Sequence, residues 1–324
     1  MEILNHFFLN YFSLITVIGL IIWLSTFLFL IKIPNKSKAA IQLLLVSIST
    51  IIYNFGYFLS HSLYIPSNFP RVISLISVLF LHNFYLQFIL HFPTLKFPKL
   101  AKFSFYSNLG ISIGLSIYLI IYLLNPMPVI FDYSGHYYEI GNKVLYKQIL
   151  LYLLTIDFIN LVLLFWNIFK SKDSERKAYS LVLLAILCIT ILPAILSIIN
   201  RYGFINREDF IVALSIIGFF GVFILLITFV NYTNDKTSFL TKIISISFII
   251  LFYVYTLVLN FMIRDRENSF DLIHQNKLES ILFLKSKTDD LKFIKQFNFK
   301  ESLFSTDYLS EDISLDENII KTEN

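Results

Sequence analysis

The chain of 324 residues is 56% hydrophobic and only 15% charged, with a formal net charge of +4. A soluble domain carries about a quarter charged residues, so this composition excludes an ordinary soluble protein and indicates a polytopic membrane protein. Basic residues exceed acidic ones before residue 264, and acidic residues exceed basic ones after it. The basic excess lies in short loops, which is typical of membrane topology rather than of nucleic-acid binding.

Apolar segments long enough to cross a bilayer recur along the chain. About 20 residues are needed for one crossing, and no Lys or Arg lies inside any of these segments. The N-terminus has neither basic residues before the first segment nor a cleavage pattern after it, so we expect a retained first span. The sequence therefore predicts an all-α integral membrane bundle of eight spans at 8–32, 39–64, 72–92, 103–125, 147–169, 178–200, 209–231 and 241–263.

The basic residues of the connecting loops predict the orientation. Loops on the cytoplasmic side of membrane proteins carry an excess of Lys and Arg. With the N-terminus outside, the inner loops hold twelve of these residues: Lys32, Lys36, Lys38, Lys96, Lys99, Lys102, Lys170, Lys172, Arg176, Lys177, Lys236 and Lys242. The outer loops then hold five: Arg71, Lys143, Lys147, Arg201 and Arg207. We therefore predict a protein of the cytoplasmic membrane with its N-terminus and, after eight crossings, its tail on the extracytoplasmic side.

Three regions are expected along the chain. Residues 1–237 form a seven-span domain, 238–263 an eighth transmembrane helix, and 264–324 a polar extracytoplasmic tail that is partly helical and then disordered. The longest outer loop, 126–146, contains two strand-like stretches on either side of Ser134 and Gly135, which predicts a small outer β-hairpin within 129–140. Such a hairpin is either an ordered loop or a lid over a ligand site.

Polar residues inside the spans are the candidate functional residues. Asn83, Gln87 and His91 are spaced four residues apart and lie along one face of the third span. His82 and His91 are nine residues apart, about 180° around a helix, so they cannot ligate one metal. Asp157 is the acidic residue deepest in any span. At 1.5 Å per residue, Asp157, His82 and Asn54 lie roughly 15 Å below the outer end of their spans.

We therefore expect Asp157 to face the bundle interior near His82, Asn83 or Asn54, because an isolated carboxylate at this depth must be protonated or paired. Two interpretations stay open for this intramembrane polar cluster. Its members are hydrogen bonds that hold helices together, or they sense a ligand, a proton or a conformational state.

Other spans contain residues that affect helix packing. Gly110 and Gly114 form a GxxxG spacing in the fourth span, which permits close approach of another helix. Gly218 and Gly221 are expected to do the same in the seventh span. Pro193 lacks a backbone N–H and should kink the sixth span.

Motifs of enzymatic chemistry are absent from the sequence. There is no Walker A loop, HExxH or GxSxG, and the inner loops are too short for a catalytic domain. Cys188 is the single cysteine, which excludes an internal disulfide and a cysteine-based metal site. We predict no enzyme activity, no catalytic residue, no metal and no cofactor.

Three loop segments carry a resemblance to known sensors. They are HFPTLKFPK after the third span, ILPAILSIINRYGFINRED across the sixth, and FVNYTNDKTSFLTKIISIS between the seventh and eighth. Over about residues 1–270 the chain resembles the N-terminal seven-transmembrane sensor region of bacterial histidine kinases. It is more similar still to the membrane regions that precede metal-dependent serine phosphatase or nucleotide cyclase domains.

The resemblance implies a sensor that couples an outer or intramembrane signal to a cytoplasmic output. No phosphoacceptor His box, ATP-binding lobe or phosphatase Asp set follows, so we expect a stand-alone sensor acting on a partner or a truncated form of a longer protein. The expected partners are the lipid bilayer, a separate cytoplasmic signalling protein and, in a homodimer, a second copy; nucleic acid is not expected. The alternatives are a small-solute transporter that uses the midplane cluster and, less favoured, an intramembrane enzyme.

Overall fold

The structure is a computed structural model that describes residues 7, 11–63, 68–124, 129–132, 137–201, 203–205, 207–233 and 235, with isolated positions between 247 and 272. Its contacts divide the chain into two units, residues 1–262 and 263–324. Almost all of the predicted tail, and most of the predicted eighth span at 241–263, lie outside the described residues. The following description concerns the first unit.

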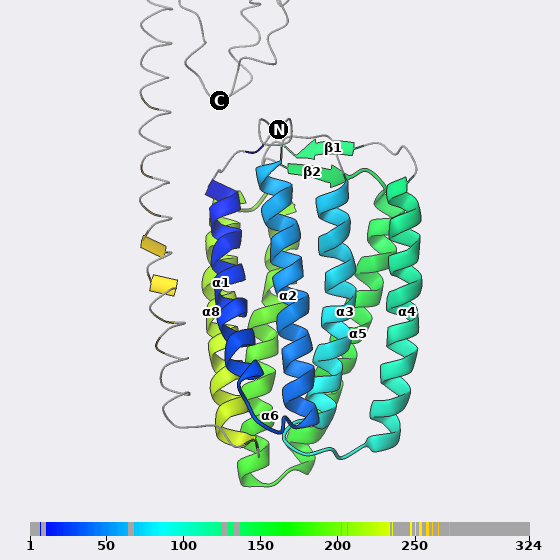
Figure 1. Ribbon diagram of the computed structural model, residues 1–324, viewed down its shortest axis with the longest axis vertical. Helices are drawn as coiled ribbons and strands as arrows, with labels where there is room; N and C mark the ends of the chain where they lie inside the picture. Colours follow the sequence, from blue (N-terminus) through cyan, green and yellow to red (C-terminus); the bar gives the residue numbers. More distant parts are fainter. Residues whose placement is uncertain are drawn as a thin grey trace, which may run out of the picture. The chain divides into compact units, whose positions relative to one another are not determined.

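Seven of the predicted spans are present as long apolar helical runs among the described residues, and they lie side by side in Figure 1. Their ends lie within a few residues of those predicted, except that the third to sixth runs begin three to five residues earlier. The helices are α1 (Tyr11–Ile31), α2 (Lys38–Ser62), α3 (Phe69–His91), α4 (Pro98–Leu124), α5 (Lys143–Lys170), α6 (Asp173–Ile186), α7 (Leu192–Arg201) and α8 (Arg207–Tyr232).

A two-stranded antiparallel sheet joins α4 to α5. Strand β1 (Val129–Asp132) pairs with β2 (Tyr137–Ile140), with Val129 opposite Ile140 and Asp132 opposite Tyr137. Both strands lie in the segment where the sequence predicts a hairpin. Ile140 is buried among apolar residues that include Val72 and Leu145, which anchors β2 on the ends of α3 and α5. That this end of the bundle faces outward stays a prediction.

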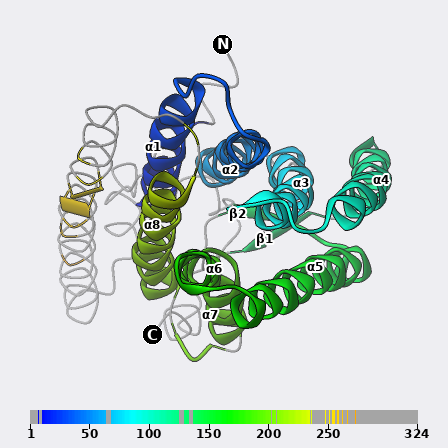
Figure 2. The same ribbon diagram turned by 90° about the horizontal axis from the view of Figure 1, so that it is seen from below.

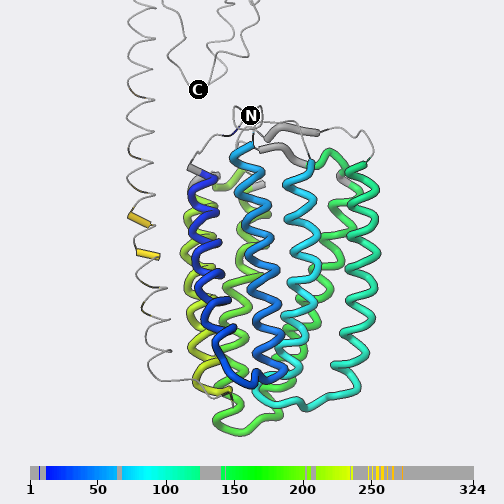
Figure 3. The backbone as a smooth tube through the Cα atoms, in the orientation of Figure 1, coloured from blue at the N-terminus to red at the C-terminus, as the bar shows by residue number. Residues whose placement is uncertain are grey.

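The bundle has two chemically different ends, which we name here. The hairpin end carries β1 and β2, and the basic end carries the loops α1–α2, α3–α4 and α5–α6 (Figures 1 and 3). The predicted orientation requires the lysine-rich loops to lie on one side of the bundle. The exposed lysines do gather at the basic end: Lys32, Lys38, Lys99, Lys102, Lys170, Lys172 and Lys177. A shared apolar core built from α1, α2, α3, α5, α6 and α8 packs the half of the bundle nearer this end, with Leu30, Leu43, Phe88 and Phe229 completely or almost completely buried.

Helix α3 is the central helix of the bundle. In the view along the helices it lies between α2, α4 and α5 (Figure 2). In its most apolar window 72% of the residues are buried, against 22% for α4. Polar side chains on α3 therefore meet other helices, whereas much of α4 faces outward.

Close helix approaches occur at Gly221, which was predicted, and at Gly56, which was not. A Cβ placed on Gly56 of α2 would lie 2.9 Å from the Pro70 carbonyl oxygen of α3, and one on Gly221 of α8 would lie 3.1 Å from the Ala185 carbonyl oxygen of α6. By contrast, nothing lies within 4 Å of such an atom at Gly110, Gly114 or Gly218. The expectation for Gly221 is confirmed. At Gly110, Gly114 and Gly218 no described residue makes such an approach, so that part of the expectation stays a prediction.

The sixth span is interrupted near Pro193. Between α6 and α7 the chain makes a π-helical segment, η2 (Leu187–Ile191), in which the amide of Leu192 donates to the carbonyl of Leu187, five residues earlier. The Thr190 hydroxyl donates to the Ile186 carbonyl at 3.1 Å. Pro193 cannot donate a backbone bond, and its ring would crowd the carbonyl four residues before it, so a wider turn relieves the clash. The disruption predicted at Pro193 thus takes the form of a π turn.

Candidate functional site

A buried acid–base pair joins helices α3 and α5 near the middle of their lengths. His82 of the 23-residue α3 and Asp157 of the 28-residue α5 lie near the middle of their helices. The His82 Nε2 is 3.4 Å from the Asp157 Oδ2. Only 7% of His82 and 5% of Asp157 are exposed. The predicted contact between these two residues is therefore confirmed.

The His82 ring is oriented by its own helix. Its Nδ1 lies 2.9 Å from the Val78 carbonyl oxygen, which can only accept a hydrogen bond, so Nδ1 carries the proton. One further proton can then lie between Nε2 and the carboxyl group of Asp157. The pair is neutral overall whether this proton resides on the imidazole or on the carboxyl. Neutrality lowers the desolvation cost of burying the pair in an apolar bundle. Gain or loss of one proton would leave a net charge there.

Several polar atoms near this pair have no hydrogen-bond partner among the described residues. They are the Asp157 Oδ1, both side-chain polar atoms of Asn160, and the Tyr85 hydroxyl. Asn160 is completely buried and Tyr85 is 1% exposed. Each lies one helical turn beyond its neighbour, Tyr85 after His82 and Asn160 after Asp157, so both flank the pair. A buried polar atom without a partner costs about 1–3 kcal/mol, and such atoms concentrate at sites of function.

A second polar face of α3 is directed at α4 and not at Asp157. The Gln87 amide donates to the Ser104 hydroxyl at 3.0 Å, and the Ser112 hydroxyl donates to the Leu79 carbonyl at 3.2 Å. Asn83, four residues before Gln87, is completely buried, and neither of its side-chain polar atoms has a hydrogen-bond partner among the described residues. The structure thus places Gln87 at the α3–α4 contact, about 140° around the helix from His82. His91 ends the face with its Nδ1 2.8 Å from the Gln87 carbonyl.

Asn54 lies apart from the pair. Its side-chain amide donates to the Thr50 carbonyl of its own helix at 2.8 Å, and its side chain packs against Gly19 of α1. Of the three neighbours expected for Asp157, the structure therefore shows contact with His82 and places Asn54 against α1. Depth along the helix was the basis of that prediction, but α2 packs between α1 and α3, and spacing alone does not fix the direction in which Asn54 points.

A cluster of tyrosines around the buried Arg71, near the hairpin end, was not predicted from the sequence. Arg71, in the first turn of α3, is only 2% exposed. Its Nη2 donates to the Tyr146 hydroxyl at 2.7 Å, and its guanidinium lies 4.4 Å from the ring centre of Tyr57, which in turn packs on Tyr53 with 4.8 Å between ring centres. The signal that could have revealed it is the spacing of Tyr53 and Tyr57, one turn apart opposite the start of the third span.

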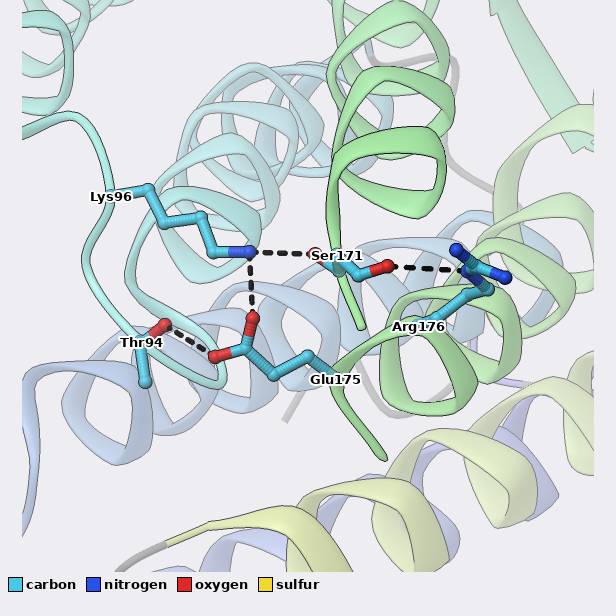
Figure 4. Close-up of polar contacts among 5 residues, drawn as sticks. All are labelled: Thr94, Lys96, Ser171, Glu175 and Arg176. Atoms are coloured by element: carbon cyan, nitrogen blue, oxygen red, sulfur yellow. Dashed lines mark hydrogen bonds and ion pairs between the residues drawn. The ribbon is translucent and has the colours of Figure 1, made fainter. Parts of the chain in front are cut away.

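A polar network at the basic end connects the helices that carry the pair. Lys96, in the loop after α3, forms an ion pair with Glu175 of α6 at 2.8 Å and donates to the Ser171 hydroxyl at 2.6 Å (Figure 4). Ser171 caps the C-terminus of α5, and its carbonyl accepts from the Arg176 Nε at 3.2 Å. Thr94 donates to the second carboxylate oxygen of Glu175 at 3.2 Å. The ends of α3 and α5 are thereby bonded to each other and to α6.

A second link at this end involves Asp235, just after α8. Its carboxylate accepts from the Ser37 amide at 2.8 Å and from the Ser37 hydroxyl at 2.7 Å. Ser37 is the N-cap of α2, because its hydroxyl also accepts from the Ala40 amide at 3.1 Å. Thr233 donates to the same carboxylate at 2.8 Å. The chain at the end of α8 is thus held by the start of α2.

Comparisons with known proteins found no match to a family model, a curated protein or a solved structure. Within the part of the chain that the structure describes, no group of three or more His, Cys, Asp or Glu side chains could hold a metal ion. The site must therefore be interpreted from its own chemistry. That chemistry is an imidazole beside a carboxyl group, with several hydrogen-bonding atoms that lack partners among the described residues, enclosed between α3 and α5.

Proposed function

We propose that this chain is a membrane sensor or receptor module of bacterial signal transduction, which is not itself an enzyme and acts on a cytoplasmic signalling partner. The observation that supports this function best is the His82–Asp157 pair, buried at mid-length on the central helix. Ionisable residues inside membrane bundles are costly and are more often functional than structural. The resemblance of the loop segments to sensor regions of histidine kinases agrees with this proposal.

The mechanism we propose has two states of the α3–α5 contact. A proton or polar ligand that engages Asp157, Asn160 or Tyr85 alters the hydrogen bonding between the helices. Helix α5 ends at Ser171 in the network described above, and the loop that follows α3 joins the same network through Lys96. A changed packing at the pair is therefore passed to the loops at the basic end, where a partner protein would read it.

Pulsed electron paramagnetic resonance tests this mechanism with the protein in lipid nanodiscs. Spin labels are placed at Leu100 and Ser174, which are exposed at the starts of α4 and α6, in a Cys188→Ser background. We expect the distance distribution between the labels to differ between pH 5.5 and pH 8, and the Asp157→Asn variant to give one distribution at both. An Asp173→Asn variant, which alters an exposed acid at the basic end, should respond as the parent does. Identical distributions for the parent and Asp157→Asn at both pH values would contradict the mechanism.

A small-solute transporter is the second candidate, favoured by the π turn that interrupts the sixth span beside Pro193. Broken helices and midplane polar groups are common in transporters. Liposomes containing the purified protein distinguish the two functions. Flux of a proton or solute that is abolished by Asp157→Asn would favour transport, whereas a pH-dependent loop movement without flux favours sensing.

A further inference from the structure

A hollow lies on the outward side of α4 at the basic end. It is a largely open depression of about 580 Å³, lined on one side by Lys99, Lys102, Phe103, Tyr106 and Ser107. All five residues belong to the first turns of one helix, and α4 is a peripheral helix of the bundle (Figure 2). The hollow is distant in the fold from the His82–Asp157 pair and plays no part in the proposed function.

The polar edge of this hollow is positively charged. Lys99 and Lys102 are both exposed, and neither forms an ion pair or hydrogen bond with another residue that the structure describes, unlike Lys96, which is paired with Glu175. The first turn of α4 contains no acidic residue. The partial positive charge of a helix N-terminus adds to that of the lysines, so this edge attracts an anion.

The aromatic residues that line the hollow belong to an apolar surface that continues along α4. Phe103 is 72% exposed and Tyr106 is 63% exposed, so both rings lie at the outer surface of the helix. Gly110 and Gly114 follow on the same face, seven and eleven residues after Phe103, and nothing lies within 4 Å of a Cβ at either position. The helix surface beyond the aromatic rings is therefore low and smooth, with room for an extended hydrocarbon chain.

We propose that this face binds an anionic phospholipid from the membrane leaflet at the basic end. The phosphate of the headgroup lies between the ammonium groups of Lys99 and Lys102. One acyl chain passes Phe103 and Tyr106 and continues along Gly110 and Gly114. A free phosphate would gain nothing from the aromatic walls, and a zwitterionic lipid would gain little from the two unpaired cations. Charge complementarity and the apolar continuation together select an anionic lipid.

The test measures lipid retention by native mass spectrometry after purification from vesicles of phosphatidylglycerol and phosphatidylcholine. We expect the wild-type protein to retain phosphatidylglycerol in preference to phosphatidylcholine. A lysine at an anionic lipid surface contributes about a fivefold gain in affinity, so Lys99→Gln with Lys102→Gln should lower retention by roughly 25-fold. Lys172→Gln with Lys177→Gln removes two exposed lysines from the same end, and this control should retain the lipid.

A second variant probes the acyl chain without altering charge. Gly110→Leu fills the low surface and should also reduce retention, whereas Gly218→Leu on α8, where a Cβ likewise meets nothing within 4 Å, should not. Equal loss in the two lysine pairs would show a general attraction to anionic membranes and would overturn the proposal. So would a dimer in the mass spectrum that Gly110→Leu dissociates, because the glycine face would then be occupied by a second copy.

Discussion

At the scale of single residues, the His82 tautomer decides which substitutions of Asp157 the bundle can tolerate. The Nδ1 proton is committed to the Val78 carbonyl, so a neutral His82 presents Nε2 as an acceptor. A side chain at position 157 that can donate a hydrogen bond will satisfy it. One that cannot will leave a buried nitrogen without a partner.

We predict that Asp157→Asn and Asp157→Leu differ in stability. The asparagine amide can donate to Nε2, so the free energy of unfolding should change by less than about 1 kcal/mol. The leucine leaves Nε2 unsatisfied and should lower it by about 1–3 kcal/mol. Unfolding of both variants in detergent micelles measures the difference. If Asn proved as damaging as Leu, the pair would need an anionic carboxylate and not a shared proton.

Residue depth could be predicted from the sequence, whereas side-chain direction could not. The His82–Asp157 contact was predicted because both residues lie equally deep and a buried carboxylate requires a partner. Asn54 lies at the same depth, but it packs on Gly19 of α1. Asn160 lies one turn beyond Asp157 and was overlooked, although its spacing marks it as part of the same face.

At the scale of helices, α3 presents two polar faces to two different neighbours. His82 faces α5 and Gln87 meets α4. On the side of α2 the contact is close, because Gly56 has no side chain between the two backbones. The position of α3 is therefore fixed by three helices through three kinds of contact.

Substitutions of glycine test the closest of these contacts. A Cβ at Gly56 would lie 2.9 Å from two backbone atoms, the Pro70 oxygen and the Ser74 nitrogen. Gly56→Ala must therefore separate α2 from α3, and we expect the free energy of unfolding to fall by about 1–3 kcal/mol. Gly114→Ala, where a Cβ meets nothing within 4 Å, is the matched control and should not lower it, because alanine favours the helix over glycine. Equal effects in thermal unfolding would contradict the close approach.

The lengths of the helices follow from the bilayer, which is why the sequence predicted them well. Span length depends on a solvent that every span shares. The π turn at Leu187–Ile191 was beyond such reasoning, since Pro193 predicts a disruption but not how the freed carbonyls find partners. The GxxxG spacing is limited in a related way, because it permits a close approach but does not identify the helix that makes it.

At the scale of the whole molecule, the concentration of lysines at one end of the bundle predicts its orientation. The described loops α1–α2, α3–α4 and α5–α6 lie at the same end (Figure 1). Positive loops are retained in the cytoplasm, so the hairpin end should be extracytoplasmic. This inference uses charge alone and is independent of the proposed function.

Cysteine labelling in a Cys188→Ser background measures the orientation. Ser174→Cys is exposed at the basic end and Phe204→Cys at the hairpin end, where the native phenylalanine is 78% exposed. We expect a membrane-impermeant maleimide to label Phe204→Cys in intact spheroplasts and Ser174→Cys only after lysis. Neither substitution removes a charge, so topology is not perturbed. The reverse pattern would invert the assignment of both ends.

The bond between Asp235 and Ser37 has a mechanical consequence. A chain that leaves a helix end without other contacts transmits tension to that helix alone. Here the carboxylate three residues after α8 ends is bonded to the amide and hydroxyl that begin α2. Tension on the polypeptide beyond this point is divided between α8 and α2, and Ala39 and Ala40 carry it directly into buried packing. The coupling also works in the other direction, so a displacement of α2 moves Asp235 through its bonds to Ser37.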